Sequence, residues 1–285
     1  MSKIVLITGA STGLGLVTAV YLAGKGATVY ATMRNTEKKN ALEESAKRSG
    51  VHINILQLDV SSEESIRNCV ENIIDREGKI DVLINNAGAG FIKASENVTE
   101  DELQWVTDVN YFGVVRCTNA VLPHMRKERS GHIINITSVG ALVGQAFNEF
   151  YCAAKFAVEG YTEALAAYLT PCFNIRFTLV EPGGMRTSFS ENLSKHLETH
   201  SGKKDPYENQ FNNFLQRREA LLKDENSPVF QELDEVAAVI NNCIESDTPP
   251  LRIRTSEFAN EFCNLKTGAD PDGLLLHSRL IKPFL

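Results

Sequence analysis

The 285-residue sequence lacks the features that mark a nucleic-acid partner, a metal centre or a disulfide framework. It has 29 lysines and arginines against 36 aspartates and glutamates, a net charge of −7, and no basic block, so no nucleic-acid partner is expected. The six cysteines are widely spaced without a CxxC pair, which predicts reduced thiols in a cytoplasmic protein. His196 and His200 stand four residues apart but without an HExxH pattern, and we predict no metal site.

A membrane span is the second class that the sequence argues against. The 21 residues from 4 to 24 carry no charge and are long enough to cross a bilayer. Eight of them, however, are glycine, serine or threonine, and no basic cluster follows. The apolar core at 4–7 is also too short for a secretory signal. We therefore expect neither a span nor a signal peptide.

Apolar bursts alternate with helix-like segments along most of the chain. The bursts predict strands at 3–8, 28–33, 53–58, 80–85, 132–137, 174–181 and 251–254. Most are continuous apolar runs, which is typical of a parallel sheet with helices on both faces. We predict an α/β fold with a single Rossmann-type, doubly wound parallel sheet of about seven strands, forming one domain over 1–285.

The segments between the strands have helical patterns. Helices are expected at 16–22, 37–48, 61–78, 99–129, 149–169 and 232–244. Thr99 and Glu102 form a capping box at the start of the long helix expected at 99–129. Residues 188–223 are polar and strand-free, and we predict a helical insertion that covers the substrate site. The tail that follows residue 254 is expected to be irregular.

A glycine-rich turn lies between the first strand and the first helix. It reads Thr8-Gly9-Ala10-Ser11-Thr12-Gly13-Leu14-Gly15, with GxxxGxG spacing. Glycines let the backbone approach a pyrophosphate, whose charge then meets the positive end of the helix dipole. A purely structural turn is the alternative.

The second motif pairs Tyr151 with Lys155, with Ser138 thirteen residues upstream of the tyrosine. Positions i and i+4 share a helix face, so the phenol and the ammonium point the same way. A phenol with a pKa of about 10 exchanges protons poorly at neutral pH until a cation favours its phenolate. A surface helix could carry the same pair, but Ser138 ends a strand where open parallel sheets bind ligands.

Together these motifs resemble the short-chain dehydrogenase/reductase family. Seven elements occur in the family's order, over residues 1 to about 190 and less distinctly to about 254. They are Thr8 with Gly9, Gly13 and Gly15; Asp59-Val60; Asn85-Asn86-Ala87-Gly88; Asn110; Ser138; Tyr151 with Lys155; and Pro182-Gly183 with Thr187.

The resemblance implies a role for each catalytic residue. Tyr151 would be the general acid in ketone reduction, and Ser138 would hold the carbonyl oxygen. Lys155 would bind the nicotinamide ribose and lower the phenol pKa, while Asn110 would anchor a water for proton relay. The purely structural alternatives are a strand-end hydroxyl for Ser138 and a helix kink for Asn110.

The resemblance also implies a set of cofactor contacts. Asp59 would accept from the adenine amino group, and the loop from Pro182 to Thr187 would frame the carboxamide. Met185 departs from the usual Val or Ile there. The full expected set is Thr8, Gly9, Ser11, Thr12, Gly13, Leu14, Gly15, Arg34, Asp59, Val60, Asn86, Ala87, Gly88, Lys155, Pro182, Gly183, Met185 and Thr187.

The choice between the two nicotinamide cofactors is argued from the end of the second strand. An NAD enzyme usually places a carboxylate there for the ribose hydroxyls. This sequence has Thr32-Met33-Arg34-Asn35 instead, and the Arg34 guanidinium suits a 2′-phosphate. NADP(H) is therefore favoured, and NAD(H) is the alternative if Arg34 is only a solvated charge.

We expect an NADP(H)-dependent oxidoreductase that interconverts a ketone or aldehyde and an alcohol, with a lipophilic small-molecule substrate. The apolar candidates for its pocket are Phe91, Ile92, Ala141, Leu142, Val143, Phe147, Met185, Phe189, Phe211 and Phe214. The alternatives are a 3-oxoacyl-thioester reductase, a general carbonyl reductase, and a catalytically idle dinucleotide-binding sensor. The resemblance further implies a homodimer or homotetramer, paired through the helices that begin near Thr99 and Glu149. The apolar face with Ala157, Tyr161, Leu165 and Tyr168 is consistent with this pairing and equally with burial inside one subunit.

Overall fold

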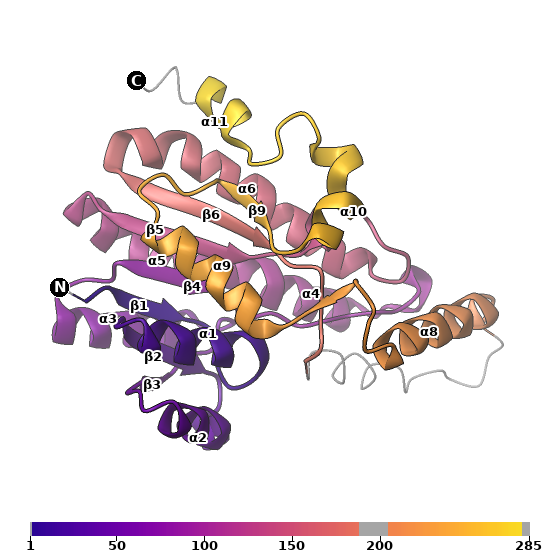
Figure 1. The fold of residues 1–285 in the computed structure, drawn as a ribbon, viewed down its shortest axis with the longest axis horizontal. Helices are drawn as coiled ribbons and strands as arrows, with labels where there is room; N and C mark the ends of the chain where they lie inside the picture. Colours follow the sequence, from indigo (N-terminus) through magenta and orange to yellow (C-terminus); the bar gives the residue numbers. More distant parts are fainter. Residues whose placement is uncertain (1, 188–204, 281–285) are drawn as a thin grey trace.

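The computed structural model describes residues 2–187 and 205–280 (Figure 1). Seven parallel strands form one sheet in the order β3-β2-β1-β4-β5-β6-β9. Their bounds are β1 Ile4–Ile7, β2 Thr28–Met33, β3 Asn54–Gln57, β4 Val82–Asn85, β5 Gly131–Ile136, β6 Ile175–Glu181 and β9 Arg252–Arg254. The strand order reverses between β1 and β4, which confirms the predicted doubly wound fold and creates a crevice at the carboxyl ends of these strands.

Helices cover both faces of the sheet, as predicted. Alternate β1 side chains point to opposite sides: Val5 and Ile7 pack against one helix layer, and Ile4 and Leu6 against the other. The first layer contains α1 Gly13–Gly24, α2 Asn40–Arg48 and α9 Leu233–Glu245. The second contains α3 Glu63–Glu77, α5 Gly113–Glu128 and α6 Glu149–Phe173. Because both faces are buried, the strands read as continuous apolar runs.

The predicted long helix at 99–129 is divided in the structure. The capping box of Thr99 and Glu102 is present and opens α4 Glu100–Thr107. A π-helical turn, η3, then occupies Asp108–Phe112 before α5 begins. The Nδ2 atom of Asn110 donates to the Val106 carbonyl at 2.9 Å. That carbonyl lies four residues earlier and would accept from a backbone amide in a regular α-helix, so the side-chain bond coincides with the change in helix geometry.

The carboxyl-terminal third differs most from the predictions. The irregular tail was a wrong prediction, because α10 Glu257–Thr267 and α11 Leu274–Leu280 lie there. The Ser256 hydroxyl caps α10 by accepting from the Ala259 amide. Two short strands, β7 Gly184–Met185 and β8 Phe230–Gln231, also pair without having been predicted.

The predicted insertion at 188–223 is described only in part. Its residues 188–204, with Phe189, His196 and His200, lie outside the described residues. The remainder contains α8 Glu208–Lys223, so the helical prediction holds for that segment. Within the described ranges, no helix combines the length and apolar character needed to cross a bilayer. The same ranges contain no cluster of three or more His, Cys, Asp or Glu side chains suited to a metal ion.

Candidate active site

The glycine turn after β1 is locked to the loop after β4. The Thr8 Oγ1 atom accepts from the backbone amides of Asn86 at 3.1 Å and Ala87 at 3.0 Å. Asn86 Nδ2 donates back to the carbonyls of Thr8 at 2.9 Å and Gly9 at 3.0 Å. Gly9 has φ +69°, and a Cβ there would lie 2.8 Å from the Cα of Ala87. Only glycine therefore allows the two loops to approach this closely.

The amino terminus of α1 forms a cradle that fits an anionic group. Gly13 opens the helix with φ +59°, and a Cβ on it would lie 3.6 Å from the Thr187 side chain. The first turn of α1 contains no acidic residue, so nothing offsets the positive end of the helix dipole. Ser11, Thr12, Leu14 and Gly15 belong to the same turn. These residues fit the pyrophosphate of a dinucleotide between α1 and the loop after β6.

Ser138 and Tyr151 border one small space beyond β5. Ser138 is the second residue after β5 and accepts from the Gly140 amide at 3.0 Å. A Cβ on Gly140 would lie 3.4 Å from Ser138 Oγ and 3.6 Å from Tyr151 Cε1. Lys155, one helical turn after Tyr151 on α6, has its Nζ 5.8 Å from the centre of the Tyr151 ring. The same Nζ donates to the Ile136 carbonyl at 2.9 Å.

Asn110 and Lys155 meet at Gly88. A Cβ on Gly88 would lie 3.0 Å from Asn110 Oδ1 and 3.5 Å from Lys155 Nζ. Asn110 is fully buried in η3, where its amide group pairs with both the N–H and the carbonyl of Ala89. The structure therefore brings the four predicted catalytic residues together from three elements: η3, the end of β5, and α6. The π turn lies at a functional position, as such turns often do.

The ionisation of the phenol differs from the sequence expectation. Burial raises the pKa of Tyr151 to about 12, and the hydrogen bond with Ser138 only partly opposes that rise. Burial also lowers the pKa of Lys155 to about 8, against the charge of Glu159, which raises it. Loss of hydration is the largest cause of the shift, so the phenol pKa is raised rather than lowered. At neutral pH the phenol is therefore protonated and the lysine is largely charged.

The remaining predicted cofactor residues lie at the carboxyl ends of the strands. Arg34 is exposed immediately after β2, and Asp59 and Val60 follow β3. Asp59 Oδ1 already accepts from the Ser61 amide at 3.0 Å. Pro182 and Gly183 follow β6, and the Pro182 carbonyl accepts from the Val139 amide at 3.0 Å, next to Ser138. Met185 lies in β7 and packs against the core around α1 and α9.

Six of the apolar candidates for the substrate pocket separate into two groups. Ile92, Phe147, Phe211 and Phe214 form a cluster that joins the loops after β4 and β5 to α8. The predicted residues Leu142 and Val143 instead contact Ala259 and Cys263 of α10. Sequence reasoning missed α10 in this region. Ser256 followed by Glu257 was the available signal, since it is an ordinary helix start.

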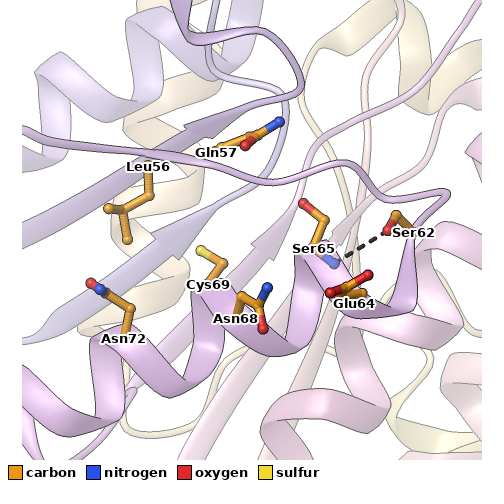
Figure 2. Close-up of a pocket in the computed structure, with 8 residues that line it drawn as sticks. All are labelled: Leu56, Gln57, Ser62, Glu64, Ser65, Asn68, Cys69 and Asn72. Carbon is orange, nitrogen blue, oxygen red and sulfur yellow. Dashed lines mark hydrogen bonds between the residues drawn. The ribbon is translucent and has the colours of Figure 1, made fainter.

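A separate polar cavity of about 340 Å³ lies between β3 and α3. Figure 2 shows its lining, with the Ser65 amide donating to the Ser62 hydroxyl at the start of α3. Ser65 Oγ also accepts from the Asp59 amide at 3.0 Å. The lining residues are Leu56, Gln57, Ser62, Glu64, Ser65, Asn68, Cys69 and Asn72, and none of them is a predicted site residue.

The fold and the site together define an oxidoreductase of the nicotinamide-dependent class. A family model described as short chain dehydrogenase matches residues 3–198. A 3-ketodihydrosphingosine reductase from Bacteroides thetaiotaomicron is 37% identical over 97% of this chain and 96% of its own length. Retinol dehydrogenase 8 from Bos taurus is 40% identical over 96% of this chain and 87% of its own.

Solved structures agree with these relatives. An actinorhodin polyketide ketoreductase variant solved with NADPH is 26% identical, with a TM-score of 0.76 over 90% of this chain and 96% of its own. The chain belongs to the short-chain dehydrogenase family, and it is a carbonyl or alcohol oxidoreductase acting on CH–OH groups. Members of this family bind NAD(P)(H). The single domain over 1–285 stays a prediction.

The cradle predicts a sharp contrast between two glycines. Gly9→Ala forces a Cβ to within 2.8 Å of the Ala87 backbone at positive φ, and should lower the unfolding free energy by about 1–3 kcal/mol. It should also weaken NADPH binding, measured by fluorescence titration. Gly24→Ala in α1, where the new Cβ would lie 4.0 Å from Val51 Cγ1, is the control and should be neutral or stabilising by up to about 1 kcal/mol. Equal unfolding midpoints for the two variants would contradict the close approach at Gly9.

Proposed function

We propose that this protein interconverts a lipophilic ketone or aldehyde and its alcohol, using NADP(H) and the Tyr151 phenol as proton donor and acceptor. One observation carries the proposal: Tyr151 and Ser138 border the space at Gly140, while Lys155 and Asn110 meet one another at Gly88. A protonated phenol, a second hydroxyl and a cation thus lie near the carboxyl ends of β4 and β5, the side of the sheet where such folds bind ligands. A dinucleotide sensor needs only the glycine turn and gives no reason for this set.

The chain's own residues would act in a fixed order during ketone reduction. Ser138 and Tyr151 donate hydrogen bonds to the carbonyl oxygen, so charge developing there meets donors already in place. The nicotinamide, when bound, supplies the reducing equivalent to the carbonyl carbon. Tyr151 gives its proton to the oxygen, which yields an alcohol. Lys155 stabilises the phenolate left behind, and Asn110 keeps the adjoining loop at Ala89 in place.

The lipophilic substrate is supported by the aromatic cluster next to this set. Phe147, Phe211 and Phe214 contact each other with ring centres 5.0 to 6.3 Å apart, on the side where α8 meets the loop before Tyr151. The similar proteins that are named for a sphingoid ketone and for retinol support the same class. A 3-oxoacyl-thioester reductase remains the second candidate, and activity measured on a panel of both substrate types distinguishes the two functions.

Six free thiols, five of them buried, support the proposed cytoplasmic compartment.

The proton-transfer role is tested by Tyr151→Phe. Removing the hydroxyl should lower kcat/KM for ketone reduction by at least roughly 10²–10⁴-fold, because the proton donor is lost. NADPH affinity should stay within about twofold, since the ring remains. Steady-state kinetics and fluorescence titration measure the two quantities. A Tyr161→Phe variant on the same helix serves as the control, and turnover preserved in the Tyr151 variant would remove the assignment.

We further propose that Arg34 selects NADP(H) by binding its 2′-phosphate. Arg34 is exposed at the end of β2, no carboxylate occupies positions 32–35, and its guanidinium is suited to a phosphate. Arg34→Ala should weaken NADPH by about 1.5–3 kcal/mol, roughly tenfold or more, and leave NADH almost unchanged. KM values for both cofactors in the wild type and in a Lys25→Ala control decide this. Better use of NADH than NADPH by the wild type would refute it.

We propose a homodimer or homotetramer that pairs the exposed face of α6. The face differs from the expected one: Tyr168 is exposed, but Ala157, Tyr161 and Leu165 are half-buried. The solvent stripe is instead Ala153, Phe156, Gly160, Ala164 and Tyr168, with no charge, and Phe156 and Tyr168 are 41% and 40% exposed. Small central residues between two aromatic ones suit close helix packing.

The pairing surface is tested by a charge at its centre. Ala164→Arg should convert the oligomer to a monomer in light scattering, because a guanidinium would have to be buried against its own copy. Ala41→Arg, on the exposed side of α2, gives the matched control and should keep the wild-type mass. A monomeric wild type at micromolar concentration would reject the proposed assembly.

A further inference from the structure

Two buried carboxyl groups lie behind the active site. Glu159 is on α6 and Glu181 is the last residue of β6, and their exposures are 6% and 0%. Glu159 Oε2 and Glu181 Oε1 converge on a single atom, Nε of Arg252, at 3.7 and 3.2 Å. Two acidic oxygens that share one guanidinium nitrogen lie close together, so their charges repel in a site with little water.

The titratable groups that face this pair come from three elements, α6, β9 and α10. On α6, Lys155 and Glu163 flank Glu159, and Glu163 also pairs with Arg252. On β9, Arg254 Nη1 lies 3.0 Å from Glu181 Oε2. On α10, the Cys263 thiol lies within the field of both carboxyls. Thr137, which follows β5, adds an uncharged donor to Glu159.

The pair is suited to hold a single proton. Burial and the charge of Glu181 raise the pKa of Glu159 well above its usual range. Burial raises the pKa of Glu181 to about 7, although the two arginines and a hydrogen bond with Glu159 lower it. When two carboxyls interact this strongly, their protons belong to the pair rather than to either residue. The pair then carries one negative charge until the pH is high enough to remove the shared proton.

The pair contacts both strand ends that carry active-site residues. Glu159 Oε1 accepts from the Thr137 hydroxyl at 2.8 Å, and Thr137 directly precedes Ser138. Glu181 directly precedes Pro182, which starts the loop at the proposed cofactor site. Glu159 also stands one helical turn after Lys155, so its charge acts on the ammonium.

We propose that Glu159 is a positioning residue for this reaction: with Glu181 it forms a one-proton carboxyl pair that keeps Lys155 charged and aligns the Ser138 and Pro182 ends of the sheet. The inference rests on the proposed function, because it assigns a task to Lys155 and Ser138. Because both carboxyls are buried, we assign them no contact with substrate or cofactor. They act through Thr137, through Lys155 and through the arginines of β9.

The test is the pH profile of kcat/KM for ketone reduction in Glu159→Gln. The amide keeps the shape but cannot supply the negative charge, so Lys155 should lose its proton at lower pH. The alkaline limb should move down by about half to one pH unit, a loss of roughly threefold to tenfold above it. Glu181→Gln should move the limb in the same direction. Glu163→Gln is the matched control, with the same change in charge two turns from Lys155 and the loss of one Arg252 contact, and its limb should stay in place.

A second measurement tests the shared proton without turnover. A carboxyl whose folded pKa is raised contributes stability below its unfolded pKa of about 4.5, and that stability is lost as the pH rises through the folded value near 7. Urea unfolding of the wild type should therefore show this loss between about pH 5 and 7, and Glu159→Gln should flatten it. An inactive wild type would refute the proposed function, but the pH dependence of urea unfolding would still show whether Glu159 and Glu181 share a proton. An active wild type whose pH–rate profile matches that of Glu159→Gln would overturn the inference alone.

Discussion

The hydrogen bonds from the Asn86 and Ala87 amides to the Thr8 hydroxyl are the contacts on which the rest of the site depends. They join the loops of β1 and β4, the two neighbouring strands from which the chain departs in opposite directions. Because those loops meet without a side chain between them, the amino terminus of α1 opens onto the same crevice as Gly88. The cradle for a dinucleotide and the anchor for Asn110 and Lys155 are therefore one piece of structure.

Burial disfavours the charged forms of the side chains in both ionisable parts of the site. At Tyr151 and Lys155 the loss of hydration disfavours both charged forms, leaving a protonated phenol next to a lysine that still titrates near pH 8. At Glu159 and Glu181 the same effect disfavours two anions, and two arginines of β9 compensate for one of them. Strand β9 thereby acts on the active site indirectly, through Glu159 inside α6 and Glu181 at the end of β6.

Much of the architecture could be predicted from local patterns. The strand at 28–33 was predicted with its observed bounds, and the Thr99–Glu102 capping box opens a helix where expected. Both follow from interactions between residues near each other in the chain. The sequence left open whether Ala157, Tyr161 and Leu165 of α6 face a partner or their own subunit, because in an apolar helix the pattern does not say which stripe a neighbouring element covers; in the structure all three are half-buried. The irregular tail was wrong for a similar reason: α10 is stabilised by burying Ala259 and Cys263 against the segment after Ser138.

What the sequence by itself determined is the alternation of strands and helices, the glycine turn and the spacing of Tyr151 with Lys155. Apolar runs, glycines and i, i+4 pairs act over a few residues, so their effect can be read in order. Only the tertiary structure decided the π turn at Asn110, the raised phenol pKa and the meeting of Glu159 with Glu181 and Arg252. These depend on desolvation and on contacts between residues distant in the chain, which no local pattern encodes.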